Sequence, residues 1–125
     1  MLKSIGRLRY AGCWLVLDCD PEIGRYYRNL YYLKHYKCHI LQRPSWEAHI
    51  SVIRDECIAT EKQNLWGKYN NQEISFYYKP YARGDGVYAW LDVECEMLLD
   101  KSEEIGLPRN PCYPLHLTIG NSKII

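Results

Sequence analysis

Two short motifs each place a hydroxyl residue two positions after a histidine: His49-x-Ser51 and His116-x-Thr118. Two imidazoles can cleave a phosphodiester without a metal, because the neutral one accepts a proton from the attacking hydroxyl and the protonated one donates a proton to the leaving oxygen. Histidine suits both roles, since its ordinary pKa of about 6.5 is near neutrality. The hydroxyls of Ser51 and Thr118 can donate hydrogen bonds to the nonbridging phosphoryl oxygens. The sequence leaves open which histidine is the acid and which is the base.

Strands are the elements expected to position these side chains. On a β-strand, residues i and i+2 project to the same face, so each motif would present its imidazole and its hydroxyl together. The intervening Ile50 and Leu117 would then point into a core. A solvent-facing strand would show the same alternation once, but the pattern occurs twice in this chain. The duplication favours a shared cleft.

A repeated strand–helix–strand unit is predicted to carry the two motifs. Segment 14–20 (WLVLDCD) resembles segment 90–96 (WLDVECE), and both lead from a strand into an acidic helix start. One helix is predicted over residues 21–36 with Asp20 as its cap, and another over about residues 97–106. Each helix leads through a proline-bearing loop to a histidine strand, 49–53 or 116–120. Between the units, strands are predicted at 65–69 and 72–79 around an Asn-Asn turn, and at 87–94.

These elements predict an α+β fold in a single domain over residues 1–125. Lobe one would span about residues 1–60 and lobe two about residues 61–125, related by a pseudo-twofold axis. Such an axis would bring both histidine motifs around one cleft. The length of 125 residues is enough for one domain with a real core.

The motifs resemble those of the 2H phosphoesterase superfamily, which has one His-x-Ser/Thr motif in each half of a duplicated domain. The surrounding segments, RPSWEAHISV at 43–52, LWGKY at 65–69, WLDV at 90–93 and EIGLP at 104–108, are similar to its phage-associated branch called "Swiss army knife RNA repair-like". Phage anti-CBASS nucleases, which destroy cyclic oligonucleotide signals, look like close relatives. The first motif has Ser where many members have Thr, and both residues supply a hydroxyl.

This resemblance implies two antiparallel sheets with outer helices around a central cleft, and catalysis without metal or cofactor. By motif position, His49 and His116 would be the acid and base, and Ser51 and Thr118 would hold the phosphate. The implied function is a phosphodiesterase that degrades cyclic oligonucleotides as a phage anti-defence enzyme, acting in the host cytoplasm. Two alternatives stay open: repair of RNA ends that carry 2',3'-cyclic phosphates, and a non-catalytic nucleotide sponge. A net charge of +1 favours a compact ligand over long RNA.

Five further residues are candidates for binding the substrate, each with a structural alternative. Tyr10 and Trp14 are expected to share one face of a first strand, where Tyr10 would stack on a base or pack in the core. Tyr113, three residues before the second histidine, would contact substrate or pack its loop. Tyr77 and Lys79 alternate in the central hairpin and would line the cleft or face solvent. No membrane or obligatory protein partner is expected.

Other groups are expected to play no chemical role. His35, Cys38 and His39 have helical spacing suited to a metal, but no fourth ligand follows at a sensible distance. The six cysteines include no CxxC pair, and no apolar signal segment opens the chain, so reduced thiols are expected. The tripeptide 83–85 (RGD) is predicted to be a turn.

Overall fold

The computed structural model describes residues 1–35, 41–44, 46–56, 58, 60–111 and 113–122. Within these residues the fold is mixed α+β, as predicted, with two α-helices and one 3-10 helix. The strands form one seven-stranded antiparallel sheet rather than the two sheets that the resemblance implied, because strands of the two halves pair with each other. The elements in chain order are β1 Leu2–Ala11, β2 Trp14–Asp18, α1 Pro21–Lys34, β3 His49–Arg54, the 3-10 helix Thr60–Leu65, β4 Glu73–Tyr78, β5 Arg83–Gly84, β6 Tyr88–Glu94, α2 Glu96–Glu104 and β7 His116–Asn121.

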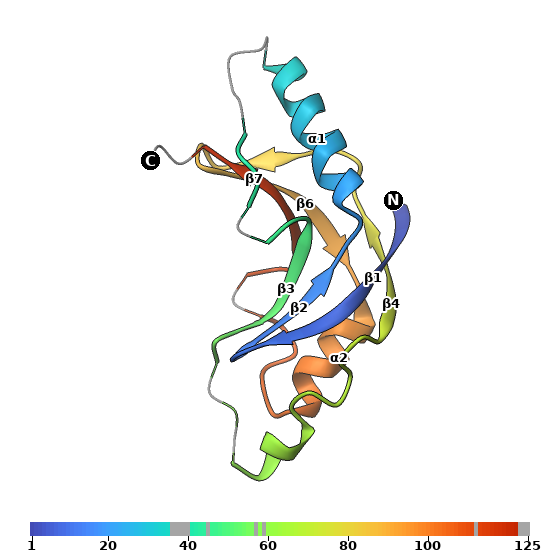
Figure 1. Ribbon diagram of the computed structural model, residues 1–125, viewed down its shortest axis with the longest axis vertical. Helices are drawn as coiled ribbons and strands as arrows, with labels where there is room; N and C mark the ends of the chain where they lie inside the picture. The colour runs from blue at the N-terminus through green and yellow to red at the C-terminus, as the bar shows by residue number, and fades with distance from the viewer. Residues whose placement is uncertain (36–40, 45, 57, 59, 112, 123–125) are drawn as a thin grey trace.

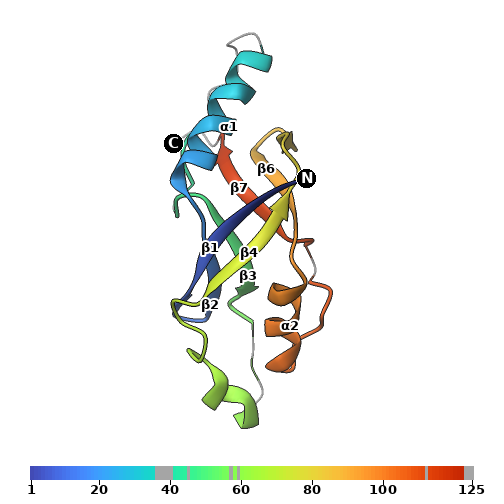
Figure 2. The same ribbon diagram turned by 90° about the vertical axis from the view of Figure 1, so that its right-hand side faces the viewer.

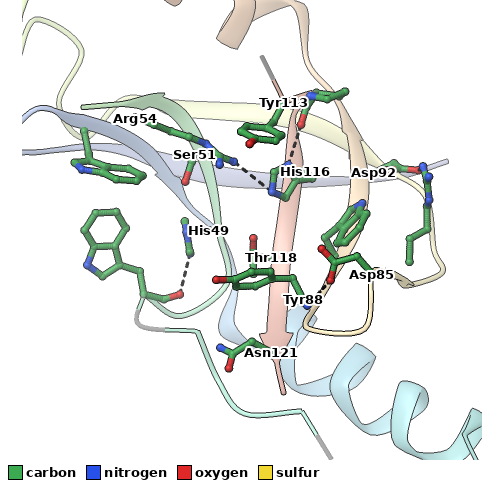
Figure 3. Close-up of a pocket in the computed structure, with 15 residues that line it drawn as sticks. His49, Ser51, Arg54, Asp85, Tyr88, Asp92, Tyr113, His116, Thr118 and Asn121 are labelled. Carbon is green, nitrogen blue, oxygen red and sulfur yellow. Dashed lines mark hydrogen bonds and ion pairs between the residues drawn. The ribbon is translucent and has the colours of Figure 1, made fainter. Parts of the chain in front are cut away.

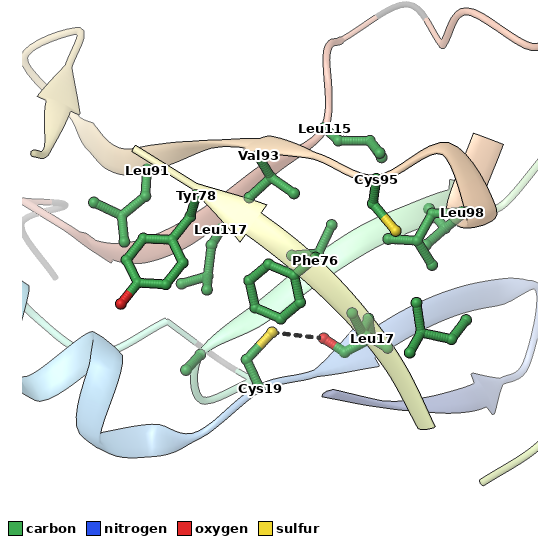
Figure 4. Packing of buried hydrophobic residues seen from close by; sticks show 14 of the residues in the cluster. Leu17, Cys19, Phe76, Tyr78, Leu91, Val93, Cys95, Leu98, Leu115 and Leu117 are labelled. Carbon is green, nitrogen blue, oxygen red and sulfur yellow. Dashed lines mark hydrogen bonds between the residues drawn. The ribbon is translucent and has the colours of Figure 1, made fainter. Parts of the chain in front are cut away.

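The sheet closes on itself around the core. Its strand order is β4-β1-β2-β3-β7-β6-β5, and β4 also pairs with β6 (Figure 1). Alternate residues of the strands point inward; in β4, for example, Ile74, Phe76 and Tyr78 are buried between exposed neighbours. Figure 4 shows Phe76 near the centre of this packing. The core includes Leu17, Ile50, Leu91 and Leu117, each fully buried. The histidine strands are therefore anchored by their inward-facing side chains.

In each repeat unit, the histidine strand pairs with the strand that precedes the helix, and the register of the two pairings is the same. In β2–β3, Asp18 lies opposite His49, and in β6–β7, Asp92 lies opposite His116. Both pairings are irregular after the hydroxyl residue, between Leu15 and Val16 in one and between Ala89 and Trp90 in the other. A bulge of this kind increases the local twist of a strand. The two histidine strands are therefore presented to the cleft in the same way.

The two helices pack across the molecule, each against the histidine strand of the other unit. Helix α1 contacts β7, and α2 contacts β3; they lie toward opposite ends of the long axis (Figure 2). The side chain of Asp20 accepts a hydrogen bond from the backbone N–H of Glu22, which confirms the predicted cap of α1. Helix α2 ends before Gly106, whose φ of 88° favours glycine. No helix among the described residues is both long and apolar enough to cross a membrane.

The predicted secondary structure is wrong in two places before β4. Residues 65–69 do not form a strand, because the 3-10 helix leads into consecutive turns there and Gly67 has a φ of 88°. Instead, the indole N–H of Trp66 donates to the carbonyl of Gly12, and β4 pairs with β1. The segment before α1 is not one strand, because a turn at Gly12, with a φ of 59°, separates β1 from β2.

The alignment of the repeat also shifts by two residues. The repeat seen in the sequence aligns Trp14 with Trp90, whereas the sheet register aligns Trp14 with Tyr88. Trp14 pairs with the residue five positions after His49, and Tyr88 pairs with the residue five positions after His116. Cys19 and Cys95 therefore do not occupy equivalent positions, although both are buried free thiols. Strand β4 belongs to the predicted second lobe but pairs along β1 of the first. The sheet is therefore continuous across the predicted boundary between the lobes, near residue 60.

Candidate active site

The two histidine motifs open on one cleft. Strands β3 and β7 are neighbours, with His49 opposite Thr118 and Ile50 opposite Leu117. The imidazoles and hydroxyls of both motifs are half-buried on one face of these strands, as the alternation predicts. Figure 3 shows all four side chains on the same side of the two strands. The cleft that they line has a volume of about 830 Å³, within the range of small-molecule sites.

Both imidazoles are held in the same way by backbone carbonyls. The Nδ1 of His49 lies 2.8 Å from the carbonyl oxygen of Trp46, and the Nδ1 of His116 lies 2.8 Å from that of Pro114. Because a carbonyl oxygen only accepts, Nδ1 of each ring must carry the proton. The Nε2 of each ring is then the atom available for proton transfer. The loops before the two strands thus orient both histidines for acid–base chemistry.

A carboxylate and an arginine stand beside each histidine, and the sequence did not single them out. Asp18, opposite His49, accepts two hydrogen bonds from Arg9, at 2.7 and 3.1 Å. Asp92, opposite His116, accepts one from Arg83 at 2.9 Å. The two arginines occupy matching positions in the sheet. Arg9 pairs with the β2 residue that lies opposite Ser51, and Arg83 pairs with the β6 residue that lies opposite Thr118.

The recurrence of Asp and Arg in β1–β2 and β5–β6 could not be found from the sequence. The tripeptide 83–85 was predicted to be a turn, but its first two residues form the short strand β5. Only Asp85 of this tripeptide stabilises a turn, because its side chain accepts hydrogen bonds from the backbone N–H groups of Val87 and Tyr88. Arg83 instead pairs with Trp90 in the sheet. A shifted repeat alignment also concealed that Asp18 corresponds to Asp92.

Burial lowers the pKa of both histidines below the ordinary value. Their backbone carbonyl partners oppose this shift, as does the negative charge of Asp18 near His49 and of Asp92 near His116. The positive charge of Arg54 lowers the pKa of both rings further. The neutral form of each imidazole is therefore favoured until an anionic ligand enters the cleft.

Aromatic side chains form the walls of the cleft. Its aromatic lining consists of Trp14, Trp46, Tyr88, Trp90 and Tyr113. Trp14 and Trp46 meet edge to face at a centroid distance of 5.5 Å. Trp46 also contacts the ring of His49, and Trp90 contacts that of His116. Flat apolar faces on both sides of a polar floor suit a ligand that carries nucleobases.

Of the five predicted substrate-binding residues, Trp14 and Tyr113 line this cleft and Tyr10 does not. The prediction for Tyr10 assumed one continuous strand, and the turn at Gly12 removes that parity argument. Trp14 pairs directly with Ala11 and shares its face, so Tyr10 points to the opposite face. There it packs against Trp66 at a ring distance of 4.8 Å. Tyr10 is thus a packing residue in the structure, which was the alternative considered.

Tyr77 and Lys79 also lie outside the lining of the cleft. The side chain of Tyr77 is 48% exposed, and it borders a second hollow formed by β4, β6 and α2. Lys79 follows β4, where its backbone N–H donates to the carbonyl of Asp92. Their alternation therefore belongs to a strand whose outer face meets solvent.

Of the candidate metal group, His35 lies within the described part of the chain. Cys38 and His39 lie outside the described residues. His35 stacks on Tyr31 at 4.1 Å, and its Nδ1 lies 2.9 Å from the carbonyl oxygen of the same residue. Across the part of the chain that the structure describes, His, Cys, Asp and Glu form no cluster of three or more that could hold a metal.

No protein-family model, curated protein or solved structure matches this chain.

Proposed function

We propose that this protein is a phosphodiesterase that acts on nucleotides by acid–base catalysis with two histidines and requires no metal. The observation that carries the proposal is that His49, Ser51, His116 and Thr118 converge from adjacent strands on one cleft. In both rings a backbone carbonyl of the preceding loop holds Nδ1, which leaves Nε2 as the nitrogen for proton transfer. A merely structural role for two histidines would not require this matched orientation.

The reaction follows from the groups at the floor of the cleft. One neutral imidazole accepts the proton of the attacking hydroxyl or water as the new P–O bond forms. The other imidazole, protonated when the anionic substrate is bound, donates its proton to the leaving oxygen as the old P–O bond breaks. Ser51 and Thr118 donate hydrogen bonds to the nonbridging oxygens, whose charge they stabilise in the transition state.

The substrate of this proposal is a cyclic oligonucleotide, and its degradation would serve a phage against a host signalling defence. The cleft supports a compact ligand, since it combines about 830 Å³ of space with aromatic walls on both sides. Arg9 and Arg83 are already paired with carboxylates, so the cleft is not a continuous basic track of the kind that long RNA requires. The matched registers also support the duplicated, two-lobed architecture of the 2H phosphoesterases, which remains part of the proposal.

The test is a substrate panel in the presence of EDTA. The purified protein is incubated with cyclic di- and trinucleotides and with an RNA that ends in a 2',3'-cyclic phosphate, and products are separated by chromatography. We expect linear products from a cyclic oligonucleotide at a rate that EDTA does not change. Preferential opening of the RNA end would favour the repair alternative, and binding without turnover would favour the sponge. A rate abolished by EDTA and restored by a divalent ion would overturn the mechanism.

The matched control is the double variant His49→Gln/His116→Gln. Glutamine retains polarity and approximate size but cannot exchange a proton near neutral pH. Its folding is checked by circular dichroism. Cleavage by this variant at the wild-type rate would refute catalysis by the two histidines.

A further inference from the structure

One of the breaks in the near-symmetry of the cleft concerns a cation. Around the floor, matching positions hold the same or similar residues, as His49 with His116 and Ser51 with Thr118. Five residues after each histidine, however, β3 has Arg54 where β7 has Asn121. Both side chains line the cleft. A cation present on one side only distinguishes the two otherwise similar halves of the site.

Arg54 is directed at the histidine of the other strand. Its Nη2 lies 3.3 Å from Nε2 of His116, and its Cζ lies 5.2 Å from the ring centroid of Tyr113. The side chain is half-buried, and burial lowers its pKa. Unlike Arg9 and Arg83, it forms no ion pair with a carboxylate among the described residues. The negative charge of Glu56 acts on this guanidinium without an ion pair, so Arg54 can still interact with the imidazole and with an anionic ligand.

The two contacts of His116 determine its protonation. The carbonyl of Pro114 requires a proton on Nδ1, because it can only accept. A guanidinium can only donate, so Nε2 must hold a lone pair to receive Arg54. His116 is therefore neutral in this arrangement, with its basic nitrogen directed into the cleft. A second proton on this ring would face the cation of Arg54 at hydrogen-bond distance.

We infer that Arg54 is a positioning residue that holds His116 neutral as the general base and so leaves His49 as the general acid. This inference rests on the proposed function. In the step it describes, Nε2 of His116 takes the proton of the nucleophile and the nucleophile–phosphorus bond forms. The bond to the leaving oxygen breaks, and that oxygen receives the proton from Nε2 of His49. The anionic phosphate draws the guanidinium away from Nε2, so the lone pair is freed when substrate is bound.

The charged surroundings of the two rings agree with this division. His116 faces Arg54 from β3 and Asp92 from β6, and that aspartate is paired with Arg83 from β5. His49 faces Asp18 of β2, and this aspartate forms an ion pair with Arg9 of β1. The positive charge of Arg54, on the same strand as His49, also acts on the ring of His49. Of the two rings, His116 alone receives a direct contact from an arginine of the described residues. The charge of Arg54 lowers the pKa of both rings, and that of Arg9 lowers the pKa of His49. The feature of Arg54 that distinguishes the rings is therefore its direct contact with His116.

The first experiment reads each imidazole by nitrogen NMR, which requires no substrate. In the wild type we expect His116 to be the Nδ1–H tautomer and to titrate below His49. Arg54→Asn, which copies the residue at the matching position, should raise the pKa of His116 by about one unit, the lower end of a close charge effect. Arg25→Asn on the exposed face of α1 is the control. Arg54→Lys keeps the charge and should keep the order of titration, which provides a test if Arg54→Asn folds poorly.

The second experiment identifies the acid by the leaving group. A diester of 4-nitrophenol needs little protonation of its leaving oxygen. The rate loss caused by His49→Ala should therefore be at least roughly tenfold smaller on that diester than on the cyclic oligonucleotide. His116→Ala should stay equally impaired on both substrates. The reverse pattern, or an unchanged His116 titration in Arg54→Asn, would overturn the role of Arg54. If no diester is cleaved, the proposed function fails, while the NMR titration still tests the contact between Arg54 and His116.

Discussion

At the scale of single residues, each imidazole proposed to transfer a proton is held at Nδ1 by a backbone carbonyl. His49→Ala and His116→Ala should each lower the chemical rate by about two to four orders of magnitude, the usual contribution of a general acid or base. Single-turnover measurements would separate this loss from substrate binding. The fold should survive, since the buried neighbours Ile50 and Leu117 hold the strands. The double variant should lose far less than the product of the single losses, because the two groups act as a unit. Full activity in either single variant would refute its assignment.

The hydroxyls are expected to act on the transition state. Ser51→Ala and Thr118→Ala should each lower kcat more than they raise KM, because charge on the phosphoryl oxygens increases as the reaction proceeds. Thr118→Ser keeps the hydroxyl and is the control for Thr118→Ala. Steady-state kinetics would measure both constants. An increase in KM at constant kcat would mean that the hydroxyls only bind the ground state.

The half-buried histidines also predict how stability depends on pH. Their pKa values are lowered in the folded protein, so below about pH 6.5 the unfolded chain binds more protons than the native one. The free energy of unfolding should therefore fall as the pH drops below that value, and the contribution should be constant above it. Urea unfolding of the wild type and of His49→Gln at several pH values would measure this slope. The variant should show a shallower slope, and an equal slope would contradict a lowered pKa for His49.

At the scale of elements, the turn at Gly12 positions part of the cleft. It separates β1 from β2 and so begins β2 at Trp14, which lines the cleft wall. Because its φ is 59° and a Cβ would meet nothing within 4 Å, substitution here tests backbone strain alone. Gly12→Ala should lower the free energy of unfolding by about 1 kcal/mol. Gly12→Asn should cost less, since asparagine tolerates this conformation. Equal losses in the two variants would mean that the strain is not backbone conformation.

The elements that the sequence predicts well are those with strong local signals. Helix α1 follows from Asp20, Pro21 and its apolar spacing, and both histidine strands follow from alternation. Residues 65–69 carried a strand-like composition, but the pairing partner of β1 is β4 instead. Strand pairing over long separations is decided by tertiary packing, which local patterns do not contain. Tyr10 was misplaced for a related reason, since one turn reverses the chain and changes the face.

At the scale of the whole molecule, the sequence predicted that four residues would meet at the floor of one cleft, but it did not predict the residues around them. His49, Ser51, His116 and Thr118 are recognisable because their spacing equals the period of a strand. Asp18 and Asp92 become recognisable as partners only when β2 and β6 are paired with the histidine strands. Arg54 reaches His116 across 62 positions of sequence. Contacts of this kind depend on the closed sheet, and no local pattern encodes them.

The distribution of charge over the molecule predicts a weak dependence on salt. The net charge is +1, and of the arginines around the cleft, Arg9 and Arg83 are already neutralised by carboxylates. Arg54 is therefore the main cation that a substrate phosphate can engage. For one or two phosphate contacts, kcat/KM should fall roughly 5- to 25-fold between 50 and 500 mM NaCl, since each contact contributes a slope of about −0.7 for single strands. The measurement uses one cyclic oligonucleotide over a series of salt concentrations, with KCl as a check on ion identity. A fall of about four orders of magnitude would require six or so phosphate contacts, and it would favour an extended RNA substrate over the compact ligand proposed.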